Sequence, residues 1–231
     1  MTPEALAEVM EATWPPLRRS KLGPFTLRDG AGGGKRVSAA SCGGGFTADD
    51  LDAACAAMAT PLMLVGKNDT ALDAALQARG WQVIDPVIAY AAPVERLTAD
   101  LPPLVDFPHW PPLEIARAIW AEGGIGPARI AVMDRVTGPK TAILARSADR
   151  PAGVSFVACN GDDAMLHALE VRPSQRRQGV GRNLLHAAAN WAASQGAARL
   201  SLVVTRQNAA ARALYARLGM ETVGQYHYRM K

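Results

Sequence analysis

A turn rich in arginine and glycine, placed between a strand and a helix, constrains this chain more than any other stretch. An apolar run over Met165–Val171 predicts the strand, the turn spans Arg172–Arg182, and helical spacing follows over Asn183–Ser194. The start of a helix leaves backbone N–H groups unpaired and carries the positive end of the helix dipole, so it attracts anions. Glycine lets a backbone approach a ligand closely, and this turn also holds four arginines. The stretch therefore predicts a binding site for a pyrophosphate.

Two sequence blocks place this turn in a family context. They are Arg176-x-x-Gly179-x-Gly181 and, one helix and one strand later, Asn208-x-x-Ala211-x-x-Leu214-Tyr215-x-x-Leu218-Gly219-Met220. The first block resembles the Arg/Gln-x-x-Gly-x-Gly/Ala signature of the GNAT superfamily of acetyltransferases. The second is similar to a block of the same superfamily that has an aromatic residue where this chain has Met220. The resemblance covers residues 110–231 well and the remainder only loosely.

The resemblance implies a site for acetyl-CoA as acyl donor and no metal. It assigns the pyrophosphate to the turn, and the pantetheine arm to the backbone at the end of the preceding strand. The implied cofactor-binding residues are Leu169, Val171, Arg176, Arg177, Gln178, Gly179, Val180, Gly181, Arg182 and Asn208. The alternative for the turn is an ordinary glycine turn that starts a helix, and helix capping alone would account for Asn208.

Acyl transfer from a thioester to an amine needs one group that protonates the departing thiolate and one that takes a proton from the amine. The resemblance implies that Tyr215 is the proton donor; the alternative is a half-buried tyrosine on an apolar helix face. His167 is the candidate base, because histidine titrates near neutral pH, and a histidine with satisfied hydrogen bonds is the other interpretation. Glu170 lies on the opposite face of a regular strand, so only a bulge would bring it to the site.

The expected fold is a mixed, mostly antiparallel α/β (α+β) sheet of the GNAT type, flanked by helices. In the second half, hydrophobic spacing predicts helices over 113–122 and 127–135 and strands over 141–147, 153–160, 164–171, 199–205 and 222–230. Asn208 is expected to cap a helix that Gly219 ends. The first strand of this half is either very short or supplied by the first half of the chain.

The first half repeats the same order faintly. Helices are expected over 47–58 and 69–79 and strands over 61–66 and 81–91, and placing Gly80 on Gly219 aligns the halves. Three aspartates, at positions 49, 50 and 52, stand where the second half has arginines, and they would repel a phosphate. We therefore expect two GNAT-like lobes, a degenerate domain over 1–100 and a catalytic domain over 101–231. The alternative for the first half is an unrelated α+β extension.

Composition narrows the function classes. Residues 1–100 carry 9 Lys and Arg against 12 Asp and Glu, whereas residues 101–231 carry 16 against 9, so the basic excess lies with the predicted anion site. No basic stripe with interleaved aromatic residues indicates nucleic acid as a partner. No apolar stretch has the length of a membrane span, and the three cysteines lack metal-type spacing. A cytoplasmic location is the expectation.

The function expected from the sequence is transfer of an acetyl group to the primary amine of a small molecule or peptide, without an acyl-enzyme. Two other classes stay open, a non-catalytic acyl-CoA-binding protein and a protein-interaction module. The glycine-rich loop at Gly30–Arg36 lacks the spacing of a phosphate-binding loop and is expected to be flexible. Homodimers are common in the superfamily, and the sequence does not decide this.

Overall fold

One long sheet runs through the molecule, and the computed structural model describes all 231 residues. Its strand order is β4-β11-β5-β10-β9-β8-β7-β6, and a second sheet has the order β1-β2-β3. The strands are β1 (Arg18–Leu22), β2 (Phe25–Asp29), β3 (Ser41–Cys42), β4 (Leu62–Gly66), β5 (Gln82–Pro93), β6 (Asp106–His109), β7 (Lys140–Ser147), β8 (Arg150–Asn160), β9 (Asp163–Val171), β10 (Arg199–Thr205) and β11 (Glu221–Met230). The helices are α1 (Pro3–Thr13), α2 (Ala48–Ala56), α3 (Thr70–Ala78), α4 (Val94–Leu97), α5 (Glu114–Glu122), α6 (Pro127–Arg135), α7 (Val180–Ser194) and α8 (Ala209–Arg217), with 3₁₀ turns η1 (Lys35–Val37) and η2 (Pro173–Gln175).

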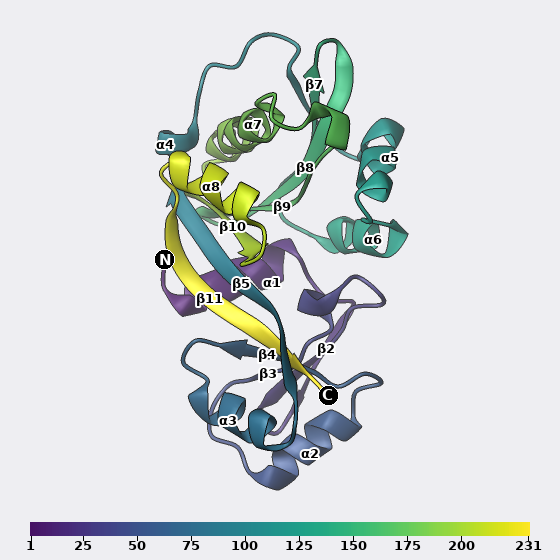
Figure 1. Cartoon of the computed structure of the whole chain (residues 1–231), viewed down its shortest axis with the longest axis vertical. Coiled ribbons are helices and arrows are strands. Elements are labelled where there is room, and N and C mark those ends of the chain that lie inside the picture. Colours follow the sequence, from purple (N-terminus) through teal and green to yellow (C-terminus); the bar gives the residue numbers. More distant parts are fainter.

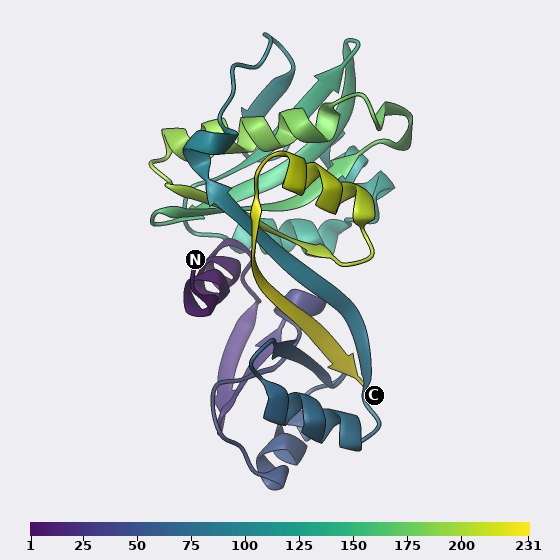
Figure 2. The same cartoon turned by 60° about the vertical axis from the view of Figure 1, so that its left-hand side comes forward.

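Two lobes share the long sheet (Figures 1 and 2). The large lobe contains β6 to β10 with α5 to α8, and the small lobe contains β1 to β4 with α2 and α3. The long strands β5 and β11 cross from one lobe to the other, and α1 lies between the lobes. None of the helices has the length and apolarity needed to cross a lipid bilayer.

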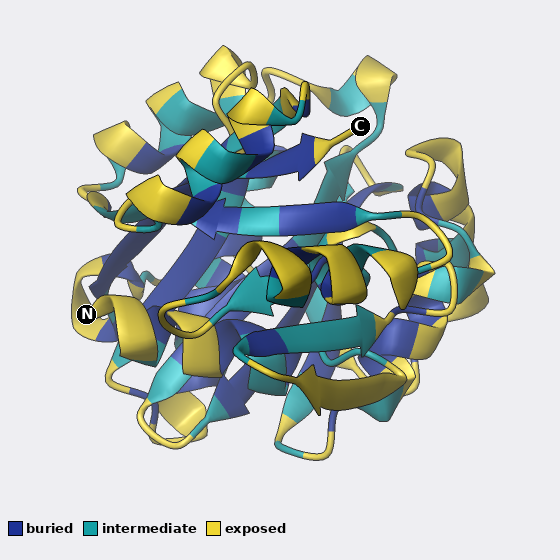
Figure 3. Cartoon of the chain, turned by 90° about the horizontal axis from the view of Figure 1, so that it is seen from below, coloured by how far each residue is buried: buried dark blue, intermediate teal, exposed yellow.

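The cores explain why the sheet of the large lobe carries helices on both faces. One cluster of 25 buried residues gathers between the sheet and the helices α7 and α8, and another of 15 gathers under α5 and α6. The buried residues follow the strands while the outer faces of the helices are exposed (Figure 3). Burial on both faces matches the nearly continuous apolar run in β8 and β9.

An internal two-fold relation links the halves of the chain. Gly80 and Gly219 both end a helix with positive φ, 79° and 75°, and they differ by 139 in residue number. The same shift relates the strand pairs: Gly66↔Tyr226 in β4–β11 corresponds to Thr205↔Val87 in β10–β5. Under this shift the pair Val87↔Tyr226 maps onto itself, at the centre of the β5–β11 ladder. The repeat predicted from the sequence is therefore present in the sheet register.

The two-fold relation exchanges the last strands of the two halves. In each half a strand and a helix lead to a long strand, β4-α3-β5 in the first and β10-α8-β11 in the second. The long strand of each half pairs with the shorter strand of the other, β5 with β10 and β11 with β4. The sheet is therefore continuous across residue 100, and the division of the chain into domains 1–100 and 101–231 stays a prediction.

The helices α2 and α7 occupy corresponding places in the two halves, before β4 and before β10, but they begin differently. In the small lobe α2 begins with a capping box, in which the Thr47 hydroxyl accepts from the Asp50 N–H at 3.2 Å and the Asp50 carboxylate accepts from the Thr47 N–H at 2.8 Å. This second bond is the largest of the contacts that lower the pKa of Asp50. The chain itself thus occupies donors at the start of α2, where it also places negative charge.

Most predicted elements of the second half are confirmed within three residues of their expected ends. The first strand of the second half was expected to be either very short or supplied by the first half. The structure has both features, because β6 is a short edge strand and β5 of the first half enters the same sheet. The hairpin of β1 and β2 was not predicted. Its first strand is exposed along its whole length, so it lacks the alternation that signals a half-buried strand.

Candidate functional site

The neighbouring strands β9 and β10 form a fork. They pair in parallel only from Arg199↔Asp163 to Leu202↔Leu166. Beyond Leu166 the edge of β9 that faces β10 has no strand partner, although its other edge continues to pair with β8 as far as Val171. The fork therefore leaves Leu169 and the N–H group of Val171 without a partner strand on this edge, where an extended ligand could bind, while the Val171 carbonyl accepts from Arg176.

A bulge shapes the upper arm of the fork. The β8–β9 register shifts between Val154 and Phe156, and Ala168 adopts a positive φ of 50°. The indole N–H of Trp120 donates to the Ala168 carbonyl at 2.7 Å and so satisfies a group that the bulge diverts. This contact and its complete burial make Trp120 part of the core. The bulge brings Glu170 to the lining of a groove between β9 and α8.

The turn after β9 presents a row of unpaired backbone donors. Arg177 and Gly179 have positive φ, 65° and 83°, and α7 starts at Val180 without a side-chain cap. The first backbone bond of the helix runs from the Asn183 N–H to the Gly179 carbonyl. The six preceding N–H groups, from Arg177 to Arg182, have no hydrogen-bond partner within the protein.

Five of the six residues that carry these donors line a groove of about 1110 Å³. Nine of the ten predicted cofactor-binding residues line it, together with Tyr215: Leu169, Val171, Arg176, Arg177, Gly179, Val180, Gly181, Arg182 and Asn208. Gln178 is the tenth, and its side chain turns back to bond Ser174 and Ser147. The small size of Gly181 matters here, since a Cβ would stand 3.4 Å from Leu214 on the opposite wall.

The arginines of the turn have different surroundings. Arg172 forms two hydrogen bonds with Glu122 of α5, at 2.7 and 2.9 Å, and so anchors the turn to the other face of the sheet. Arg176 donates to the Val171 carbonyl at 3.1 Å and lies 3.5 Å from the Glu170 carboxylate. Burial raises the pKa of Glu170, and the charge of Arg176 partly opposes that shift. Arg177 and Arg182 are exposed and have no acidic partner.

Tyr215 comes to the groove from the middle of α8. Its side chain is 6% exposed, and its ring lies 5.6 Å from that of Tyr90 on β5. Burial raises the pKa of Tyr215 to about 12. Asn208 caps α8, since its side chain accepts from the Ala211 N–H at 3.1 Å. The capping role expected for Asn208 is therefore confirmed.

His167 lies away from this groove. Its Nδ1 is 3.0 Å from an Arg36 guanidinium nitrogen, and its Nε2 is 2.8 Å from the Thr13 hydroxyl, which donates to the Val9 carbonyl. Because a guanidinium only donates, Nδ1 must accept and Nε2–H must donate to Thr13. Burial, together with the charge of Arg36, moves the pKa of His167 well below its ordinary value. Both ring nitrogens are thus committed, and the arrangement does not support the expected role of His167 as base.

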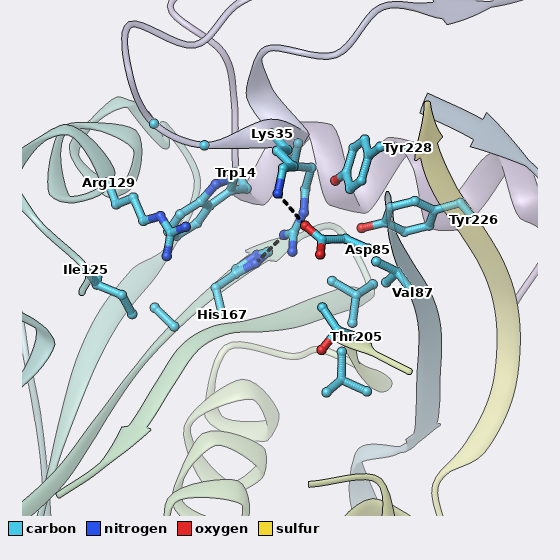
Figure 4. Close-up of a pocket in the computed structure, with 16 residues that line it drawn as sticks. Trp14, Lys35, Asp85, Val87, Ile125, Arg129, His167, Thr205, Tyr226 and Tyr228 are labelled. Atoms are coloured by element: carbon cyan, nitrogen blue, oxygen red, sulfur yellow. Dashed lines mark hydrogen bonds and ion pairs between the residues drawn. The ribbon is translucent and has the colours of Figure 1, made fainter. Parts of the chain in front are cut away.

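A second, smaller cavity of about 250 Å³ meets the fork from the inter-lobe side (Figure 4). It is lined by His167 and Ala168 on one arm and by Val203 to Thr205 on the other. Ala168 in this cavity directly precedes Leu169 in the groove, so the two spaces approach each other across the fork. The small lobe supplies Lys35 and Arg36 to the cavity.

Comparisons with known proteins agree with this fold and groove. The acetyltransferase (GNAT) family model matches residues 118–220. A protein of Bacillus subtilis described as the uncharacterized N-acetyltransferase YobR is 33% identical over 66 residues, which is 29% of this chain and 27% of that protein. The aligned stretch therefore spans about a quarter of that relative.

Solved structures resemble the whole chain. A GCN5-related N-acetyltransferase from Kribbella flavida is similar with a TM-score of 0.72 at 19% identity, covering 100% of this chain and 96% of that one. A tandem GNAT protein from the clavulanic acid biosynthesis pathway has a TM-score of 0.62 at 15% identity, covering 98% and 87%. The chain thus has the fold of GNAT N-acetyltransferases, and residues 118–220 match the model of this acetyltransferase family.

Two groups that the structure brings to the site had little or no signal in the sequence, although Glu170 was considered for the case of a bulge. Glu170 depends on the bulge, and the signal for it is weak because a left-handed alanine leaves no glycine in the sequence. Arg36 lies 131 residues before His167, so no local pattern connects them. Three buried polar atoms lack any partner, Arg36 Nε, Ser155 Oγ and Gln175 Oε1, and all three belong to residues at or near the fork and the turn.

Proposed function

We propose that the chain transfers an acetyl group from acetyl-CoA to a primary amine. The observation that carries the proposal is the row of six unpartnered N–H groups from Arg177 to Arg182 at the uncapped start of α7. Three of these residues, Gly179 to Gly181, are buried or half-buried, where backbone donors are almost always paired, and two phosphate groups would supply the missing acceptors. The exposed guanidinium groups of Arg177 and Arg182 add charge at the same place.

The remainder of the donor binds along the fork. The pantetheine arm, which carries amide groups, pairs with the backbone of Leu169 and the N–H group of Val171 in the manner of an added strand. This places the thioester near Tyr215 on the groove side, and near Ala168 on the inter-lobe side. The acceptor amine then approaches from the second cavity.

The chemical step is a direct displacement. The amine nitrogen attacks the thioester carbonyl carbon, the new C–N bond forms, and the C–S bond breaks. Glu170 takes the proton from the amine, because burial raises its pKa toward the range in which a carboxylate is an effective base. The Tyr215 hydroxyl stabilises the departing thiolate by donating to sulfur. His167 takes no part in this proton transfer.

The first half of the chain, in this proposal, does not bind a second coenzyme. Its counterpart to α7 is α2, whose Thr47 and Asp50 already bond each other's backbone N–H groups. Asp49 and Asp50 in the first turn of α2 add negative charge where a phosphate would lie. The division into a degenerate domain and a catalytic domain therefore follows the starts of these two helices.

Titration calorimetry with acetyl-CoA tests the donor site. We expect Gly179→Glu to weaken binding by at least about 100-fold, since it brings a carboxylate to the phosphate position. Gly196→Glu is the matched control: Gly196 has nearly the same φ, 84°, at the other end of α7, so the backbone strain is similar. Equal affinities of the two variants would refute the site. Binding of acetyl-CoA without thiol release over an amine library would instead identify a non-catalytic binder.

A further inference from the structure

The cavity between the lobes has an excess of positive charge. Lys35, Arg36 and Arg129 line it, and Asp85 is the one carboxylate among its lining residues. Asp85 pairs with Lys35. Neither Arg36 nor Arg129 has an acidic partner anywhere in the chain. Two guanidinium groups therefore line one small cavity without a carboxylate partner of their own; that of Arg129 is labelled in Figure 4.

Arg36 is held in place without being neutralised. One of its terminal nitrogens donates to His167 Nδ1, at 3.0 Å, and the neutral imidazole leaves the guanidinium charge uncompensated. Its Nε is buried and has no partner. A buried, uncompensated donor of this kind is costly, and the cost falls when an anion binds. His167 thus acts as a positioning residue for Arg36. The Trp14 ring stacks on the His167 ring, with 4.9 Å between the ring centroids.

The loop that carries Arg36 is built to reach this cavity. Gly33 is buried against α6, and a Cβ there would stand 2.4 Å from a Val132 methyl carbon. The segment is thus a loop, as expected, and at Gly33 it packs directly on the large lobe. Close packing on α6 also brings the loop beside Arg129, whose Nε lies 3.5 Å from the position of a Cβ on Gly34.

We propose that this cavity binds an amine acceptor that carries a carboxylate, an amino acid in the broad sense, with Arg36 and Arg129 as partners of the carboxylate. The proposal rests on the proposed acetyl transfer. It follows from the two unpaired guanidinium groups and from the position of the cavity, which reaches the fork at Ala168, next to the groove. A guanidinium matches a carboxylate through two parallel N–H bonds, and a cavity of about 250 Å³ suits a small acceptor.

The test compares each acceptor with its amide. A panel of α-, β- and γ-amino acids and the corresponding amino-acid amides is assayed by thiol release at saturating acetyl-CoA. We expect at least one acid to be used with a kcat/KM about 10- to 100-fold above that of its amide, the effect of one charge-assisted contact pair. Arg129→Gln should remove most of this preference by raising KM for the acid and not for the amide.

Arg117→Gln is the matched control, because Arg117 lies on the neighbouring helix α5 and does not line the cavity. A direct measurement needs no turnover: calorimetry with the N-acetyl derivative of the preferred acid, or of each acid in the panel if none turns over, should detect binding to the wild type that Arg129→Gln weakens. Equal use of acids and amides, or no carboxylate binding by either method, would overturn the proposal even if acetyl-CoA binds. Absence of acetyl-CoA binding would instead refute the donor site, and the calorimetric result would still decide the cavity.

Discussion

The replacement Tyr215→Phe tests how the leaving group is stabilised. Burial raises the pKa of Tyr215 to about 12, whereas an ordinary thiol has a pKa of about 8.5. Complete proton transfer from this phenol to a thiolate is thus uphill by about 3.5 pKa units, or about 5 kcal/mol. The hydroxyl is therefore expected to donate a hydrogen bond to the departing thiolate and to keep its proton.

The size of the effect follows from that role. A hydrogen bond to a charged group contributes about 1.5–3 kcal/mol, so Tyr215→Phe should lower kcat about 10- to 150-fold. The Kd for acetyl-CoA should change less than about threefold, because in the proposed arrangement the hydroxyl contacts the sulfur and not the phosphates. Tyr90→Phe is the control, since Tyr90 packs against the same ring but does not line the groove.

The assay is thiol release measured from pH 6 to 10 with calorimetry in parallel. With a pKa of about 12, Tyr215 stays protonated across this range, so kcat of the wild type should show no alkaline decline that Tyr215→Phe abolishes. Such a decline, or a loss of activity with Tyr90→Phe equal to that with Tyr215→Phe, would refute this account of Tyr215. A proportional loss of coenzyme affinity would move the residue from the chemical step to binding.

Two further predictions concern titrating groups. Glu170→Gln should lower kcat about 100-fold and abolish the acidic limb of the pH–rate profile, which lies above pH 4.5 because the pKa of Glu170 is raised. Glu122→Gln is the control, since Glu122 also pairs with an arginine of the turn. An acidic limb that persists in Glu170→Gln would contradict the role of Glu170 as base. The pKa of His167 is lower in the folded chain than in the unfolded chain, so protonation at acid pH favours the unfolded chain. The free energy of unfolding should therefore fall by about 1.4 kcal/mol per pH unit once the pH drops below about 6.5. Urea unfolding at pH 6.5 and 5.5 should show that loss in the wild type and a smaller one in His167→Gln; equal losses would mean that His167 is protonated in the folded chain.

The donor site was readable from the sequence because its determinants are local. Gly179 takes the positive φ that its type permits, and the helix begins at the next residue. Both determinants belong to one short stretch of chain. The same holds for Asn208, whose capping bond reaches only three residues along the chain.

The acceptor side was not readable because its parts come together only in the folded chain. The bulge places a positive φ on Ala168, a residue type that gives no warning of it. The contact between Arg36 and His167 joins residues 131 positions apart, and it reverses the meaning of the histidine. A strand histidine beside a solvent-filled cleft would be a plausible base, whereas one that accepts from a guanidinium is a neutral support.

The two-fold relation between the halves explains why the large lobe needs the first half even if, as proposed, the first half binds no coenzyme. Exchange of the long strands makes β5 the neighbour of β10, so the large lobe lacks a complete sheet without the first half. The same exchange brings Lys35, Arg36 and Asp85 against the fork. In the proposed function the first half binds no coenzyme, and its loops instead line the proposed acceptor cavity beside the second half. Substitutions in residues 30–36 should therefore change acceptor preference while the affinity for acetyl-CoA stays constant. A parallel change in both would contradict the separation of the acceptor cavity from the acetyl-CoA groove.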